Sequence, residues 1–180
     1  MEATSVRPGY ELWRPNREKA SSKSMKAIVA LVLFVSAALI VIVTLGGWDR
    51  LQSSSVAFMS LIYAGIYVLF ALLIMGWNRG LLPVAASLAI ILAIFATIAA
   101  PAWFSRSKDG LDSPVLPEDL LGLLTLVLVP VQLLLIVVAL LAFNQEWHVE
   151  EERPIGGQPL AGEDAASPPP SQGASPPQPA

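Results

Sequence analysis

Four uninterrupted apolar stretches constrain this chain more than any other feature. They cover residues 27–47, 56–77, 81–104 and 120–143, and none of them contains Asp, Glu, Lys, Arg or His. An α-helix rises about 1.5 Å per residue, so about 20 apolar residues cross the roughly 30 Å hydrocarbon core of a bilayer. Each stretch has that length and is apolar on all sides. The sequence therefore predicts an all-α membrane protein built as a bundle of four transmembrane helices.

The tryptophan positions agree with the limits of these stretches. One tryptophan lies near the C-terminal end of each stretch, and the four are Trp48, Trp77, Trp103 and Trp147. Indole rings prefer the headgroup level, where the ring is in apolar surroundings and the N–H can reach a polar partner. We therefore interpret the four tryptophans as interface anchors.

The distribution of lysine and arginine predicts the orientation. Residues 1–26 carry six of the eleven basic side chains, and Arg79 and Arg153 would lie on the same side of the membrane. Only three would face the other side, namely Arg50, Arg106 and Lys108. Because basic loops stay in the cytoplasm, we expect both termini to be cytoplasmic in a multi-pass plasma-membrane protein. The alanine- and proline-rich composition is typical of a bacterial source.

The segments outside the spans differ in charge and in predicted order. Residues 1–26 form a basic cytoplasmic segment that would be attracted to anionic headgroups. Residues 144–180 form a cytoplasmic tail that is first acidic and then rich in Pro and Ala. The Pro- and Ala-rich part, from Pro154 to Ala180, buries too little apolar surface to fold and is predicted to be disordered. The first span is longer than the roughly 7–15 apolar residues of a signal peptide, so we expect a retained helix. Met25 remains an alternative translation start.

Small side chains at regular spacing predict one packing face. Transmembrane helices associate by close packing of small residues, and the third span repeats them every four positions, at Ala85, Ala89, Ala93 and Thr97. The short turn at residues 78–80 predicts that the second and third helices are antiparallel neighbours.

The fourth span contains the one site that we would choose at membrane depth. Pro130 frees the carbonyl of Leu126 and is expected to bend the helix. Gln132 is the only primary amide in any span. It could bond to a freed carbonyl or to another helix, and we predict a hinge or a packing site there.

Other polar residues leave alternatives open. Tyr63 and Tyr67 lie on one side of the second span and would either pack ordinarily or border a slot for a quinone or pigment. Pro117 followed by two acids predicts a helix start. The acids of that loop could also bind a divalent cation, although no calcium-loop spacing is present; they are Asp109, Asp112, Glu118 and Asp119. His148 beside three glutamates favours a solvated helix end over a metal site.

These patterns exclude most chemistry at membrane depth. Proton relays, ion-coupled transporters and voltage sensors carry ionisable residues inside the bilayer, and the four spans have none. The chain also lacks cysteine, phosphate loops, HExxH and a nucleophile elbow. We therefore predict no enzyme activity, no catalytic, metal or cofactor-binding residues, and no nucleic-acid partner.

The remaining function classes are structural or conductive. The first expectation is an accessory or scaffolding subunit that lies in the lipid bilayer beside a larger membrane-protein partner. The alternative is a small pore or carrier formed by a homo-oligomer, with Gln132, Thr125 and the tyrosines lining a path. A lipid-modifying enzyme is a weaker third option, because the spans offer no base or nucleophile.

Overall fold

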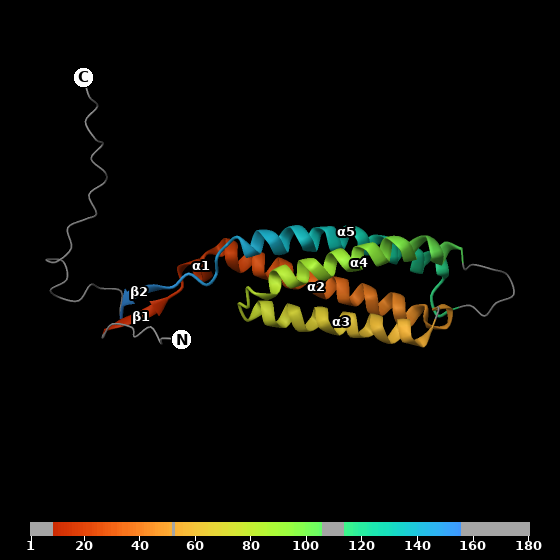
Figure 1. Cartoon of the computed structure of the whole chain (residues 1–180), viewed down its shortest axis with the longest axis horizontal. Helices are drawn as coiled ribbons and strands as arrows, with labels where there is room; N and C mark the ends of the chain where they lie inside the picture. The colour runs from red at the N-terminus through yellow and green to blue at the C-terminus, as the bar shows by residue number, and fades with distance from the viewer. Residues whose placement is uncertain (1–8, 52, 106–113, 156–180) are drawn as a thin grey trace, which may run out of the picture. The chain divides into compact units, whose positions relative to one another are not determined.

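Four long helices dominate the structure, a computed structural model that describes residues 9–51, 53–105 and 114–155 (Figure 1). Each is long and apolar enough to cross a membrane, and the four are α2 (Ala20–Gly46), α3 (Ser54–Met75), α4 (Leu81–Phe104) and α5 (Glu118–Phe143). The other described elements are short, namely β1 (Tyr10–Trp13), α1 (Pro15–Glu18), the 3-10 turn η1 (Trp48–Arg50) and β2 (Glu151–Pro154). The predicted helical class with four apolar helices is confirmed.

The helix limits follow local chemistry close to the apolar stretches. The hydroxyl of Ser53 accepts a hydrogen bond from the N–H of Val56 and so caps the start of α3. Helix α5 begins directly after Pro117, with Glu118 and Asp119 in its first turn, where acids complement the helix dipole. This agrees with the helix start predicted from the Pro-Glu-Asp pattern. Helix α2 extends the first apolar stretch toward the N-terminus and includes Lys26.

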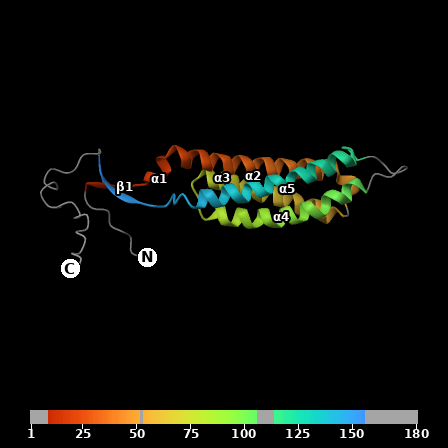
Figure 2. The same cartoon turned by 90° about the horizontal axis from the view of Figure 1, so that it is seen from above.

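The bundle is closed on three sides and loosely joined on the fourth (Figures 1 and 2). Helix α4 packs extensively on α5, while α2 packs on both α3 and α5. Helices α3 and α4 touch at few positions although a short turn joins them. The two helices predicted to be antiparallel neighbours therefore meet at few positions along their length. The turn fixes only the helix ends that it connects, and the side chains beyond it decide the packing.

Glycine permits close packing where α2 and α4 finish, which we call the Gly47 end of the bundle. A methyl group at Gly47 would lie 2.4 Å from a ring carbon of Trp103 and 2.9 Å from the side chain of Leu121. A methyl group at Gly122 would likewise lie 2.8 Å from the Phe104 ring. These aromatic rings therefore occupy the space that a side chain would need.

The segments that flank the bundle form a second compact unit. Strand β1 pairs antiparallel with β2, so that Glu11 faces Arg153 and Trp13 faces Glu151. The guanidinium of Arg153 lies 2.8 Å from the Glu11 carboxylate and 5.1 Å from the centre of the Trp13 ring. The sequence did not reveal this pairing, because the acidic residues after Phe143 were interpreted as a solvated helix end and disorder was predicted from Pro154 onward. The rest of that predicted tail, from residue 156, lies outside the described residues.

We predict that Gly47→Ala lowers the stability of the bundle, because the added methyl group must displace Trp103. Overpacking of this kind costs about 1–3 kcal/mol of unfolding free energy. The measurement is thermal unfolding in detergent, followed by circular dichroism. Gly65→Ala is the matched control, since a methyl group there meets no atom within 4 Å. Equal melting temperatures for the two variants would contradict the packing argument.

Candidate functional site

The side chain of Gln132 joins three helices in the middle of the bundle. The hydroxyl of Tyr67 in α3 donates to Gln132 Oε1 over 2.8 Å, and Gln132 Nε2 donates to Ser36 Oγ in α2 over 3.0 Å. Ser36 in turn donates to the carbonyl of Val32 over 2.8 Å. All three side chains are fully buried. The chain of hydrogen bonds thus ends on a backbone carbonyl and satisfies both ends of the amide.

This contact decides between the two partners predicted for Gln132. The missing N–H of Pro130 leaves the carbonyl of Leu126 without its usual partner in the helix. The amide of Gln132 nevertheless bonds across to α2 and α3. A buried amide without partners would be costly in hydrocarbon. The residue therefore acts as a link between helices.

Tyr63 extends the polar contacts toward α4. Its hydroxyl donates to the backbone carbonyl of Leu88, which connects α3 to α4. The rings of Tyr63 and Tyr67 lie 5.2 Å apart and are tilted by 55°. The two tyrosines thus form one aromatic pair, with hydroxyls bonded to different neighbouring helices.

The small residues predicted as a packing stripe do not share one environment. Ala85 and Ala89 are fully buried, Ala93 is half-buried and Thr97 is exposed. Each four-residue step turns about 40° beyond a full helical turn, so a long stripe at this spacing rotates away from the contact. The buried face of α4 continues instead at Ala96 and Ala100.

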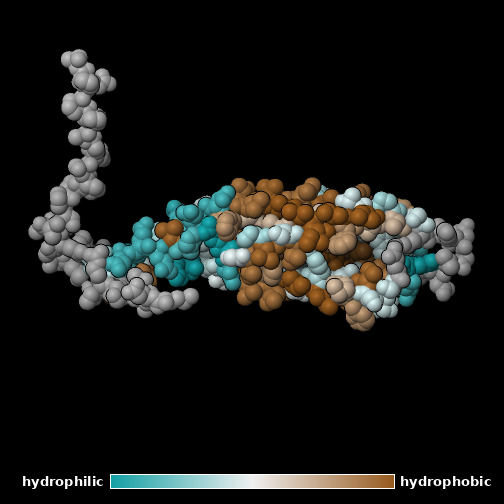
Figure 3. All heavy atoms as spheres, viewed as in Figure 1, coloured by the Kyte–Doolittle hydropathy of each residue, from teal (hydrophilic) through white to brown (hydrophobic). Residues whose placement is uncertain are grey.

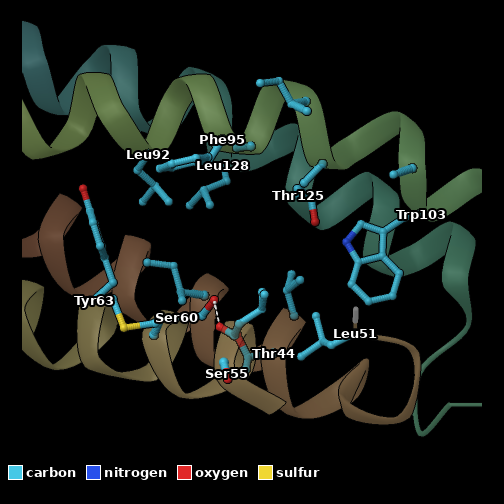
Figure 4. Close-up of a pocket in the computed structure, with 18 residues that line it drawn as sticks. Thr44, Leu51, Ser55, Ser60, Tyr63, Leu92, Phe95, Trp103, Thr125 and Leu128 are labelled. Atoms are coloured by element: carbon cyan, nitrogen blue, oxygen red, sulfur yellow. Dashed lines mark hydrogen bonds between the residues drawn. The ribbon is translucent and has the colours of Figure 1, made fainter. Parts of the chain in front are cut away.

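A cavity of about 730 Å³ lies toward the Gly47 end (Figure 4). All four long helices contribute to its wall, and most of the lining side chains are apolar. The polar exceptions are hydroxyl groups, belonging to Thr44, Ser55, Ser60, Tyr63 and Thr125. Tyr63 and Thr125, which the sequence suggested as bordering a slot or lining a path, belong to this wall. Apart from the predicted anchor Trp103, the other lining residues drew no prediction, because they are ordinary apolar or small side chains within their own helices.

Basic and aromatic side chains gather where α3 and α5 finish, which we call the Trp147 end. Lys26 Nζ lies 3.9 Å from the centre of the Trp77 ring and donates to the carbonyl of Met75. The rings of Trp77 and Trp147 meet edge to face at 5.3 Å, and Trp147 is fully buried. The last carbonyls of a helix lack the N–H partners of a following turn, so a lysine that bonds to one of them stabilises the helix terminus.

Arg79 performs the same function for α5. Its Nε donates to the carbonyl of Phe143 over 2.8 Å, and its Nη1 lies 2.6 Å from His148 Nδ1. His148 therefore contacts the arginine that bonds to the end of α5. Among the described residues, no group of three or more His, Asp or Glu side chains is arranged to hold a metal ion. Asp109 and Asp112 of the predicted acidic group lie outside the described residues, while Glu118 pairs with Arg50 at 3.8 Å.

The tryptophans predicted as interface anchors divide between the two ends. Trp77 and Trp147 meet at the Trp147 end. At the Gly47 end, Trp48 is half-buried against Phe58 and Trp103 is 2% exposed. Two of the four rings, those of Trp103 and Trp147, are therefore enclosed by protein.

We predict a measurable coupling between Tyr67 and Gln132. In a double-mutant cycle, Tyr67→Phe and Gln132→Leu should each lower the unfolding free energy of the bundle. The double variant should lose less unfolding free energy than the two single losses added together. Interhelical hydrogen bonds of this kind contribute about 0.6–1.7 kcal/mol. The measurement is the unfolding free energy in mixed micelles. Thr97→Val, which removes an exposed hydroxyl of α4, is the control, and strictly additive losses would contradict the link.

Comparison of the chain with protein-family models, with curated proteins and with solved structures finds no match in any of the three. Interpretation of its function therefore depends on the contacts made by its own residues. Those contacts comprise a closed polar link at the centre, a hydrophobic cavity at one end and capped helix termini at the other.

Proposed function

We propose that this protein is a non-catalytic accessory or scaffolding subunit of a larger membrane complex. The observation that carries the proposal is the closed hydrogen-bond network around Gln132. Its amide and the two hydroxyls beside it already have partners within the bundle. Few polar groups at depth are thus left to bind or convert a polar solute.

The charged groups near the membrane support the same role. Lys26 and Arg79 bond to backbone carbonyls at the ends of helices. Their hydrogen bonds stabilise the bundle itself. A site for chemistry would need charged groups that converge on a space for a substrate.

The paired flanking strands supply a surface for a partner. An even number of spans would bring both flanking segments to one side, which the lysine and arginine distribution predicts to be the cytoplasm. The pairing of β1 with β2 joins these segments into one unit that carries charges of both signs. A two-stranded sheet also leaves free strand edges, and such edges recruit partners by strand addition.

We predict that the tagged full-length protein, captured from its native membranes in mild detergent, carries a stoichiometric membrane-protein partner. Size-exclusion chromatography and mass spectrometry of the complex are the measurement. Recovery of a lone homo-oligomer would contradict the proposal. It would favour the pore, for which Gln132→Leu should then change solute flux in liposomes.

A charge swap tests whether the paired strands present the partner site. Glu11→Lys places a lysine opposite Arg153, and like charges across strands cost about 0.2–1 kcal/mol. If that energy is lost from the partner contact, the single variant should recover about 1.4- to five-fold less partner. The double variant Glu11→Lys, Arg153→Glu again has opposite charges across the strands. It should recover as much partner as the wild-type protein. Equal recovery by all three proteins would exclude the paired strands from the contact.

A further inference from the structure

The cavity at the Gly47 end has the depth of one bilayer leaflet. On α3 its lining runs from Ser55, in the first turn of the helix, to Tyr63. Eight residues at about 1.5 Å each span roughly 12 Å, which is somewhat less than half of the roughly 30 Å hydrocarbon core. The space therefore extends from interface level toward the middle of the membrane.

The cavity lies beside the loosely joined seam between α3 and α4. These helices are connected by the hydrogen bond from Tyr63 to Leu88 and make few contacts overall. The lining residues of α4 begin beyond Leu88, at Leu92, and continue to Trp103. Figure 3 shows the brown, hydrophobic surface hollowed between these two helices. A ligand could thus enter sideways from the lipid.

The lining favours a hydrocarbon chain over a polar solute. Small side chains of α4 create the space, namely Ala96, Ala99 and Ala102. The hydroxyls of Ser60 and Thr125 donate to carbonyls of their own helices over 2.9 Å and 2.7 Å. Their protons are therefore not free for a solute in the cavity, and Figure 4 marks the bond made by Ser60.

Two further hydroxyls lie at the interface end of the cavity. Ser55 is exposed at the start of α3, and Thr44 lies close to the end of α2 with 3% exposure. Within the described part of the chain, no residue forms a hydrogen bond with the Thr44 hydroxyl. Both lie in the terminal turns of apolar helices that are long enough to cross a membrane, where the glycerol and ester oxygens of a lipid would be within reach as hydrogen-bond acceptors.

The cavity is a narrow space of about 730 Å³ bordered by all four long helices. A transmembrane helix with its side chains is about 10–12 Å across. An unbranched chain is much thinner and can fill the same depth.

We propose that this cavity is a binding site for one acyl chain of a bilayer phospholipid. The lipid belongs to the leaflet at the Gly47 end. Its chain lies between α3 and α4 below Ser55, and its ester region meets the Thr44 hydroxyl. The site does not depend on a protein partner, so it goes beyond the accessory role and can be tested on the pure protein.

The experiment uses the full-length protein in phosphatidylcholine nanodiscs that contain phosphatidylcholine with a spin-labelled acyl chain. Electron paramagnetic resonance measures the fraction of immobilised lipid. Ala99→Phe places an aromatic ring inside the cavity, where the chain would lie, and should remove about one immobilised lipid per protein chain, as expected for a single site. Thr97→Phe adds a similar volume to the exposed side of the same helix and should retain the wild-type fraction.

Thermal unfolding in detergent separates ligand loss from misfolding. The melting temperature of delipidated wild-type protein should rise when phosphatidylcholine is added. The melting temperature of folded Ala99→Phe should rise by a smaller amount. If Ala99→Phe does not fold, Ala102→Leu narrows the same cavity and decides the question. An unchanged immobilised fraction in a folded cavity-filling variant would overturn the proposal, as would an equal loss in Thr97→Phe.

Discussion

Every polar group inside a bilayer must find its partner within the protein, and the rest of this structure depends on that constraint. Helices satisfy it for the backbone, because their hydrogen bonds lie within one segment. The described side chains show the same principle at Gln132, Tyr67 and Ser36. The one primary amide in the spans thus connects α2, α3 and α5. Its hydrogen bonds fix how each of these helices is rotated about its own axis.

The loose seam between α3 and α4 follows from the weak forces that join helices in lipid. Without a hydrophobic drive between them, helices associate where small residues pack closely or where polar groups bond. Helix α4 meets α5 through a row of buried alanines, whereas its described side-chain hydrogen bond to α3 comes from Tyr63. Beyond that bond the helices separate, and lipid can fill the space without losing favourable surroundings.

The two ends of the bundle differ in what they offer to other molecules. At the Gly47 end, closely packed rings border an apolar cavity. At the Trp147 end, cations bond to the last carbonyls of α3 and α5. The flanking strands form a separate charged unit. The proposed lipid site and the proposed partner surface thus belong to different units of the chain.

The sequence by itself determined the four helices and most of their limits. Length and hydropathy are properties of a single segment, so the apolar stretches and the Pro-Glu-Asp start of α5 were sufficient. The sequence also singled out Gln132, because an amide in a span is rare. Only the tertiary structure decided its partners, since Tyr67 and Ser36 lie on other helices.

The rotation of each helix also required the tertiary structure. A four-residue repeat marked Thr97 as part of the stripe, but the buried face of α4 passes to Ala96 and Ala100 instead. The pairing of Glu11 with Arg153 and the cavity beside Thr44 likewise join residues distant in the chain. Such contacts depend on how the segments are placed in space, and no local pattern encodes that placement.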